Sequence, residues 1–413
     1  MLPETCYNVH AHYPLVQLMI SHNIHTDLIT ECYDRAILLL KHNSTPLGIN
    51  AASRTKKAEG RFYASIFGRD AAICSLGMVV SGDAQLVKCA KNSLLTLAKY
   101  QAPNGQIPKF ITPEKNEADF WYTGCIDATI WWLIAVDFFD RTLPEAGLKK
   151  RLTRKIDLAI YWLRCQEHQS LWLLQQNEAS DWADIMPRSG FVLYTNALWY
   201  QVKKIYSISH AQKTRYYFRY IFSPFEKTVP EHRRAQILSH FIKKQITSSA
   251  FYLSFVNLSF WGPEVDVYGN ILSMLFGLSP KSKSLNRVEE MMNLKINEPY
   301  PVKSVHAPIR QNSPLWRIYM ERHKQNYPHQ YHNGGIWPYI AGFWIMLLQM
   351  MKKNRLAWKE LERFAKINSI NNWEFNEWFH GKTGKPMGMP GQSWNAAMFI
   401  LAYQCLKNDI KGI

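Results

Sequence analysis

Apolar residues recur with a helical period along most of this chain, and this pattern constrains its fold more than any other feature. In 26–42, for example, apolar residues return every three or four positions, and Thr26 and Asp27 supply a cap. The same pattern predicts about a dozen helices. They are Thr26–His42, Asp70–Val80, Ala84–Tyr100, Asp127–Phe139, Glu145–Gln166, Tyr194–Tyr206, Glu231–Lys244, Val267–Leu278, Asn286–Met292, Gly335–Lys352, Ala357–Ile367 and Gln392–Leu406.

The predicted helices come in pairs, and the connectors between pairs are rich in Gly, Pro and charged or aromatic residues. A closed toroid of helical hairpins fits this rhythm, with the more apolar helices inside and the chemistry on connectors at one end. An open α-solenoid is the alternative, but repeat proteins show a sequence period and none is found here. Only Phe251–Leu258 is predicted to be extended or a loop. We therefore predict an all-α protein.

The length of 413 residues is too great for one small core, but one large closed architecture could use all of it. Hydrophobic residues make up 47% of the chain and charged residues 20%, which indicates a globular protein. No Ser/Gly linker or low-complexity tract divides the sequence. We therefore expect a single domain over residues 1–413.

The formal net charge of +17 is of the kind that accompanies binding to nucleic acid or an anionic membrane. Lys and Arg are spread along the chain and are densest between Lys213 and Lys244, a region that includes Lys227. No fingerprint of a nucleic-acid module accompanies them, so we interpret this region as a solvated helical face and predict no nucleic-acid partner. A non-catalytic basic scaffold that binds polyanions is the alternative function.

The cysteines are odd in number and none has CxxC spacing, which is typical of reduced, buried thiols in a cytosolic protein. They are Cys6, Cys32, Cys74, Cys89, Cys125, Cys165 and Cys405. The first residues lack the basic and apolar regions of a signal peptide. The longest apolar runs, such as Ile130–Val136, are too short to span a bilayer. We predict a cytoplasmic protein without a membrane partner and leave its oligomeric state open.

Two carboxylates lie close together in the stretch Ala179–Gly190, just before a strongly helical run. Asp181 and Asp184 are separated by Trp-Ala, and Arg188 follows them. A carboxylate on a rigid turn before a helix is well placed for catalysis. We predict that Asp184 is a catalytic acid, and Asp181 is the alternative.

Four other loops combine polar residues with rings or glycines, each at the end of a predicted helix. They are 65–70, which contains Arg69 and Asp70; 121–127, from Trp121 to Asp127; 331–338, with His332, Asn333, Gly335 and Trp337; and 376–394, with Glu377, Gln392 and Trp394. Each carboxylate by itself can be explained as a helix cap or an exposed turn acid. Together, the five loops gather several carboxylates among aromatic rings.

Hydrolysis of a glycosidic bond requires two carboxyl groups, one protonated to release the leaving oxygen and one ionised to activate water. Burial against rings would raise the pKa of the acid, and charged or hydrogen-bonded neighbours would keep the base ionised. The chain also contains 15 Trp, 21 Tyr and 20 Phe, which form either a large core or a cleft in which sugar faces stack on rings. A glycosidase site is therefore the favoured interpretation.

A metal site is the competing chemistry. His329 and His332 are three positions apart and His10 and His12 two apart, but no third ligand with zinc spacing follows either pair. A nucleophilic Ser or Cys has no support, since GxSxG is absent and no Cys–His motif is evident. We predict no metal.

Four segments resemble six-hairpin (α/α)6 glycosidases: Phe67–Asp70, Asp127–Trp132, Tyr331–Pro338 and Glu377–Gly384. The patterns are most similar to those of neutral/alkaline invertases and of the glucosidase region of glycogen-debranching enzymes. The strongest motifs are YHNGGxWP and the final E-x5-T-G loop. The resemblance implies an (α/α)6 toroid, inverting hydrolysis of a small glucoside or related oligosaccharide, and no cofactor.

By this resemblance, Asp184 matches the general acid and Glu377 the general base. The predicted substrate-binding residues share these loops or the starts of the helices that follow them. They are Arg69, Asp70, Trp121, Asp127, Asp181, Arg188, Tyr194, Asn196, His332, Asn333, Gly335, Trp337, Gln392 and Trp394. The expected partner is a small carbohydrate.

The chain departs from the invertase pattern at Leu193–Asn196. Invertases have Glu-Ile-Gln before this helix, so a substrate-contacting acid is missing here or replaced by Tyr194 or Asn196. Sucrose is therefore not assigned as the substrate. A phosphorylase or lyase on the same toroid is the nearest alternative enzyme, but Glu377 argues against a phosphorylase, in which phosphate replaces the activated water.

Overall fold

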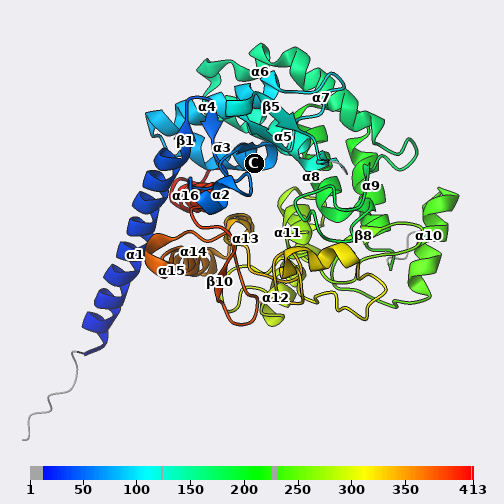
Figure 1. Cartoon of the computed structure of the whole chain (residues 1–413). Coiled ribbons are helices and arrows are strands. Elements are labelled where there is room, and N and C mark those ends of the chain that lie inside the picture. Colours follow the sequence, from blue (N-terminus) through cyan, green and yellow to red (C-terminus); the bar gives the residue numbers. More distant parts are fainter. Residues whose placement is uncertain (1–12, 122–123, 226–229, 411) are drawn as a thin grey trace, which may run out of the picture.

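Six helices form a closed inner ring in the computed structural model, which describes residues 13–121, 124–225, 230–410 and 412–413 (Figure 1). They are α3 (Gly68–Val80), α5 (Ile126–Thr142), α8 (Leu193–Ile205), α11 (Val267–Leu275), α13 (Pro338–Met350) and α16 (Ser393–Asn408). Each packs against the next in this order, and α16 packs back against α3. These helices are apolar on nearly all sides, which is why they are buried in the middle of the protein.

The outer helices are apolar on one face only and cover the ring. They include α1 (Tyr13–Asn43), α4 (Ala84–Lys99), α7 (Thr153–Cys165), α9 (Ala211–Phe222), α12 (Lys281–Asn293) and α14 (Asn354–Asn368). In contact with the ring, α4 packs on α3, α7 on α5, α9 on α8, α14 on α13, and α1 on α16. Inner and outer helices alternate along the chain, so the predicted (α/α)6 toroid is confirmed.

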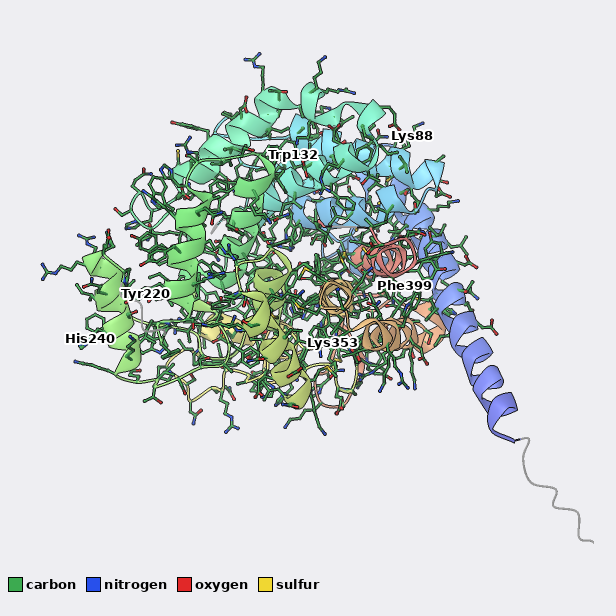
Figure 2. All side chains as sticks on the ribbon, turned by 180° about the vertical axis from the view of Figure 1, so that it is seen from behind. Lys88, Trp132, Tyr220, His240, Lys353 and Phe399 are labelled. Carbon is green, nitrogen blue, oxygen red and sulfur yellow. The ribbon has the colours of Figure 1, made fainter. Side chains whose placement is uncertain are left out.

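Buried and exposed positions follow this two-layer arrangement in the view from behind (Figure 2). Trp132 on α5 and Phe399 on α16 are fully buried, whereas Lys88 lies on the outer helix α4. The indole nitrogen of Trp132 donates to the carbonyl of Leu94 at 3.0 Å, which joins an inner helix to an outer one.

Short antiparallel sheets organise the connectors. The strands are β1 (Ser44–Thr45), β2 (Gly48–Ile49), β3 (Ile66–Phe67), β4 (Phe110–Thr112), β5 (Glu117–Asp119), β6 (Gln175–Gln176), β7 (Gly190–Val192), β8 (Phe255–Val256), β9 (Trp378–Phe379) and β10 (Pro386–Met387). They form the sheets β1-β2, β3-β4-β5, β6-β7-β8 and β10-β9. In register, Phe67 faces Phe110 and Phe191 faces Val256. Because β3 and β7 run directly into α3 and α8, these sheets fix where the two inner helices begin.

The remaining elements are short: α2 (Lys56–Glu59), η1 (Pro113–Lys115), η2 (Pro144–Ala146), α6 (Leu148–Arg151), α10 (Arg233–Lys243), η3 (Ile318–Lys324) and α15 (Ile370–Trp373). The helix predicted over 145–166 is wrong as one element, because it is divided into η2, α6 and α7. Gly147 separates the first two pieces with a left-handed φ of 54°. The sequence prediction also missed α9 as a separate helix, and α13 begins at Pro338 rather than at Gly335.

Some predicted features fall outside the described residues, namely Cys6, His10, His12 and Lys227. Within the described part of the chain, every helix is too short or too polar to cross a membrane.

The close approach of α3 and α16 depends on Gly77. A methyl group at this position would lie 1.9 Å from the carbonyl oxygen of Ala397. We predict that Gly77→Ala lowers the free energy of unfolding by about 1–3 kcal/mol, because the two helices must move apart. Chemical denaturation measures this change.

Gly60→Ala is the matched control, since Gly60 is exposed, has a φ of −64° and has its nearest neighbouring atom at 3.4 Å. A Gly77→Ala protein as stable as the control would contradict the proposed packing.

Candidate active site

The second residue of each inner helix points to one common region. These residues are Arg69, Asp127, Tyr194, Tyr268, Tyr339 and Trp394. Arg69 Nη1 lies 3.2 Å from Asp127 Oδ2, and the Tyr194 hydroxyl donates to the same oxygen at 2.9 Å. Ring centroids are separated by 5.2 Å from Tyr194 to Tyr268, by 5.6 Å from Tyr268 to Tyr339 and by 4.0 Å from Tyr339 to Trp394. The N-terminal ends of all six helices therefore meet, and the site lies there.

A buried ion-pair network joins the first three of these helices. Asp127 has no exposed surface, and Arg69 and Asp70 are 8% and 6% exposed. Burial raises the pKa of Asp70 to about 6, although Arg69 counteracts part of this rise. Tyr194 also accepts a hydrogen bond from the Trp131 indole at 2.7 Å. Tyr194 is thus a neutral donor to Asp127 and adds no further negative charge to this buried network.

Asp181 is committed to a second buried network. Its oxygens accept from the backbone nitrogen of Ala183 at 2.8 Å and from the Gln176 amide at 3.0 Å. Arg188 lies 3.6 Å from Asp181 and 2.7 Å from Asp266. Asp266 also caps α11 by accepting from Gly269 at 3.0 Å. Because breaking a buried pair leaves an uncompensated charge, this network holds the 179–190 stretch against α11.

Asp184 is more accessible, since 24% of its side chain is exposed. Its carboxylate pairs with the ammonium group of Lys109 at 2.9 Å. Burial by itself would raise the pKa of Asp184, but Lys109, with His332 and Arg69, lowers it below the ordinary value. The sequence-based prediction missed Lys109. Its only signal was its place directly after the turn-rich connector at 101–108.

Glu377 is buried in contact with Tyr63 and Met389. The Tyr63 hydroxyl donates to Oε1 at 2.5 Å, and the backbone nitrogen of Met389 donates to Oε2 at 3.1 Å. Burial raises the pKa of Glu377 to about 7, although both hydrogen bonds favour the ionised form. Asp184 and Asp70 raise it further through charge repulsion, so the three carboxyls share one electrostatic environment. The pKa directions are therefore the reverse of those expected for an acid at Asp184 and a base at Glu377.

Aromatic rings form the wall of the site. His332 stacks on Trp337 with centroids 5.0 Å apart, and Trp182 meets His332 edge-on at 4.9 Å. Several buried polar atoms in the described part of the chain have no hydrogen-bond partner: Asp70 Oδ2, Trp182 Nε1, His332 Nδ1, Tyr339 Oη, Gln392 Nε2 and Oε1, and Trp394 Nε1. Buried polar atoms are rarely left unpaired, so these atoms are the candidates for binding a polar ligand.

Three predicted sugar ligands do not fit this structure. Asn196 accepts from Leu174 and donates to the carbonyls of Leu174 and Val192, so its amide is fully engaged. Asn333 is engaged in the same way with Ile309 and with Asn326. A side chain at Gly335 would lie 2.6 Å from the Tyr331 carbonyl, so this glycine permits a close turn. All three shape the loops and do not present groups to a ligand.

Trp121 and Trp337 lie within the site but contribute through their rings. The ammonium of Lys109 is 3.2 Å from the centroid of the Trp121 ring. The Trp337 indole donates to the carbonyl of Tyr331 at 2.9 Å, which fixes the ring beneath His332.

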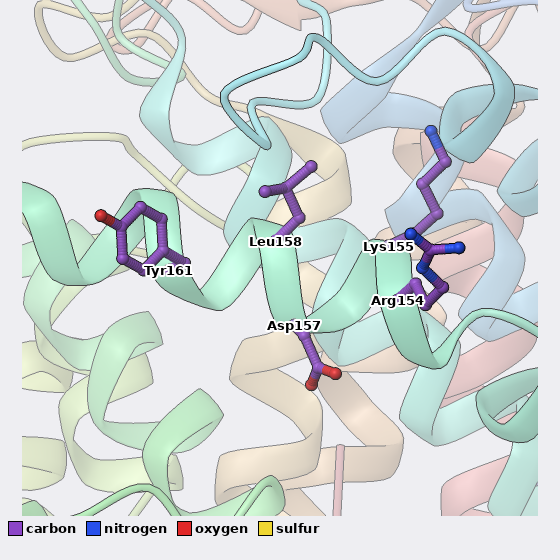
Figure 3. Close-up of a pocket in the computed structure, with 5 residues that line it drawn as sticks. All are labelled: Arg154, Lys155, Asp157, Leu158 and Tyr161. Carbon is purple, nitrogen blue, oxygen red and sulfur yellow. The ribbon is translucent and has the colours of Figure 1, made fainter.

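A separate surface hollow of about 640 Å³ is lined by residues of α7 alone (Figure 3). These are Arg154, Lys155, Asp157, Leu158 and Tyr161, and none of them belongs to the networks above. Across the described ranges, no group of three or more His, Cys, Asp or Glu residues is arranged to hold a metal ion.

A family model described as "Alkaline and neutral invertase" matches residues 192–409, more than half of the chain. The chain belongs to the alkaline and neutral invertase family. Two curated relatives are probable alkaline/neutral invertase A of Arabidopsis thaliana and neutral/alkaline invertase 3 of Oryza sativa subsp. japonica, both named as chloroplastic. Each is 28% identical over 146 residues, which are 34% and 33% of this chain. The matches span only 22% and 23% of the relatives' own lengths.

Solved structures share the fold at low sequence identity. A mannosylglycerate hydrolase from Thermus thermophilus, in complex with Tris and D-glycerate, has a TM-score of 0.62 and 13% identity. That match covers 90% of this chain and 99% of the hydrolase. A bacterial glucoamylase complexed with acarbose has a TM-score of 0.61 and 14% identity, over 91% of this chain and 55% of the glucoamylase.

The family match includes Tyr194, the loop around His332, and Glu377. It does not reach Asp184, Asp127 or the Arg69–Asp70 pair. The roles predicted for those residues therefore lie outside the family match.

Tyr63→Phe tests the surroundings of Glu377. The hydrogen bond from Tyr63 stabilises the ionised carboxylate, so its loss should move the pKa of Glu377 above about 7. A pH titration of the glutamate carboxyl carbons by ¹³C NMR measures the shift.

Tyr100→Phe is the control, because the Tyr100 hydroxyl donates to Asn116 at the surface. An unchanged or lower pKa in Tyr63→Phe would mean that this bond does not hold Glu377.

Proposed function

We propose that this chain is an inverting glycoside hydrolase in which Asp184 is the general acid and Glu377 the general base. The observation that carries the proposal is the contrast between two coupled carboxyls at the ring of helix N-termini. Glu377 is buried, held by Tyr63 and has a pKa of about 7, which suits a base that works near neutral pH. Asp184 is the partly exposed carboxyl of its loop, whereas Asp181 is engaged on both oxygens.

The unpaired polar atoms would bind the hydroxyls of the sugar whose bond is cleaved. Asp70 and Gln392 offer oxygen acceptors, Trp182 and Trp394 offer indole donors, and His332 offers a ring nitrogen. Arg69 and Asp127 orient these sugar-binding side chains without contacting the reacting atoms. The stacked rings of Tyr339 and Trp394 provide an apolar surface of the kind on which a sugar face packs.

In the reaction, protonated Asp184 transfers its proton to the glycosidic oxygen as the bond from that oxygen to the anomeric carbon breaks. A water molecule attacks the anomeric carbon from the opposite face, and ionised Glu377 takes the proton of that water. The products are a free sugar of inverted configuration and the free leaving alcohol. Room for the water requires carboxyls separated by about 6.5–9.5 Å.

The proton that the pair carries must sit on Asp184 for this reaction. Near pH 7 the surroundings favour the reverse, since Lys109 keeps Asp184 ionised and burial favours protonated Glu377. Both arrangements have the same total charge. A substrate that weakens the Lys109–Asp184 pair would move the system from the resting to the productive form.

The substrate class that we propose is a small glucoside or related oligosaccharide, hydrolysed without a cofactor. The named activity of the invertase relatives and the glycosidase names of the structural neighbours support this class. We also propose one catalytic domain and a cytoplasmic location. The free cysteines Cys32, Cys74, Cys89, Cys125, Cys165 and Cys405 support a reducing compartment.

Asp184→Asn and Glu377→Gln should each reduce hydrolysis of an ordinary glycoside by about 10²–10⁴-fold, because each removes a proton-transfer group. A panel of glucosides with NMR detection of the first-formed anomer measures rate and stereochemistry together. Glu374→Gln is the control, since Glu374 contacts exposed Asn371. An active Glu377→Gln enzyme, or a product that retains its configuration, would exclude the assignment.

A glycosyl fluoride separates the two roles. Fluoride leaves without protonation, so Asp184→Asn should keep activity on this substrate while Glu377→Gln should not. If Asp184→Asn lost activity on the ordinary glycoside and on the fluoride, while Asp181→Asn kept activity on the fluoride only, the acid would be Asp181.

The pH profile gives an independent test. The active form carries one proton on the Asp184–Glu377 pair, and in the free enzyme that form loses its proton as pH rises through about 7. We therefore expect kcat/KM to fall about tenfold for each pH unit above about 7, and to stay level below it until the lowered pKa of Asp184 is reached. A kcat/KM that instead falls as pH decreases from about 7 to about 5 would contradict this pair.

A further inference from the structure

Lys109 is built into the site and is not a mobile surface lysine. Only 8% of its side chain is exposed, and its ammonium lies 2.9 Å from Asp184 Oδ2 and 3.2 Å from the centroid of the Trp121 ring. Its backbone nitrogen donates to Asp119 at 2.7 Å, and its carbonyl accepts from Gly68 at 2.8 Å. Strand pairing and the start of α3 thus hold a cation against one carboxylate.

This position is unfavourable for the proposed acid. The charged and titratable groups that act on this pair are Arg69 and His332, the carboxyls of Asp70 and Glu377, the hydroxyls of Tyr63 and Tyr331, and the thiol of Cys125. Only Asp184 makes an ion pair with Lys109 in the described part of the chain. A group that drew Lys109 away would leave Asp184 without its counter-ion, and protonation would become easier.

More positive charge lies beside this pair. The guanidinium of Arg322 is 5.9 Å from the centroid of the same Trp121 ring. Burial, Arg322 and Arg61 together lower the pKa of His323, so both arginines lie near that residue. Because a general acid touches the leaving oxygen, the leaving group must enter the region of Asp184, Lys109 and Trp121.

We propose that the leaving group of the natural substrate carries a carboxylate or a phosphate, which binds Lys109 and thereby releases Asp184 to act as the acid. The inference rests on the proposed function. The anion replaces Asp184 as the partner of Lys109. Glu377 releases a proton to solvent and Asp184 takes one up from solvent, so the total charge of the two carboxyls is unchanged. Hydrolysis then proceeds with water as the only co-reactant.

Matched substrate pairs test the proposal. One pair is sucrose and sucrose 6′-phosphate, which differ by a phosphate on the leaving sugar. The other is glucosylglycerol and glucosylglycerate, which differ by a carboxylate. We expect the wild-type enzyme to favour one charged member by at least about tenfold in kcat/KM, as for a charge-assisted hydrogen bond. The preferred pair distinguishes phosphate from carboxylate.

Lys109→Met should abolish this preference. Its activity on the neutral member should persist to higher pH than that of the wild type, because Asp184 loses the cation that keeps it ionised. Lys109→Arg should keep the preference, since the charge is retained. Lys99→Met is the matched control, because Lys99 also lies over a ring, that of Tyr100 at 5.3 Å, but on the outer helix α4.

Inhibition gives a second measurement that does not depend on the natural sugar. With a glycosyl fluoride as substrate, D-glycerate or fructose 6-phosphate should inhibit the wild type at least about tenfold more strongly than glycerol or fructose. This difference should disappear in Lys109→Met.

Equal use of neutral and charged members, with Lys109→Met slower on both and its alkaline limb unmoved, would overturn the inference and leave the proposed hydrolase intact. Stronger inhibition by anions that persists in Lys109→Met would also overturn it. Failure of the enzyme on the fluoride and on both pairs would instead refute the proposed function.

Discussion

The buried ion pair between Arg69 and Asp127 is the interaction on which the functional end of this protein depends. It joins the first turns of α3 and α5, and Tyr194 extends it to α8 through the same carboxylate. Removing either partner would leave a charge in an apolar interior, at a cost of several kcal/mol, about 3–5. The six helix N-termini are consequently held together around polar groups, and aromatic contacts complete the ring through α11, α13 and α16.

The acidic residues near this ring differ in how fully their partners engage them. Asp127, Asp181 and Asp266 are engaged by arginine and by hydrogen bonds from their surroundings, so they stabilise loops and helix starts. Asp184 and Glu377 are held less fully. Asp184 pairs with one lysine, and Glu377 accepts hydrogen bonds from one tyrosine and one backbone amide. This difference supports the proposed proton transfer by Asp184 and Glu377, because a carboxyl fixed by several strong partners does not readily change its protonation state.

Much of the fold was predictable because inner helices are apolar on every side and outer helices on one. The starts of α3, α5, α8 and α16 were placed within two residues, and the paired arrangement indicated a toroid. The division of 145–166 was not predicted, since Gly147 and Leu152 interrupt a segment whose apolar spacing continues. In the site, Tyr268 and Tyr339 were missed because a tyrosine early in a helix has no distinctive local signal.

By itself, the sequence determined the helical architecture, the loops that carry polar and aromatic residues, and the family. Periodicity and local motifs suffice for these, because they arise from neighbours along the chain. Only the tertiary structure decided which carboxyls are neutralised and which are held by few partners. Asn196 and Asn333 are engaged by backbone groups from other loops, and Lys109 reaches Asp184 from 75 positions away. Burial and charge pairing depend on these distant contacts, which is why the protonation of these carboxyls is a property of the folded ring.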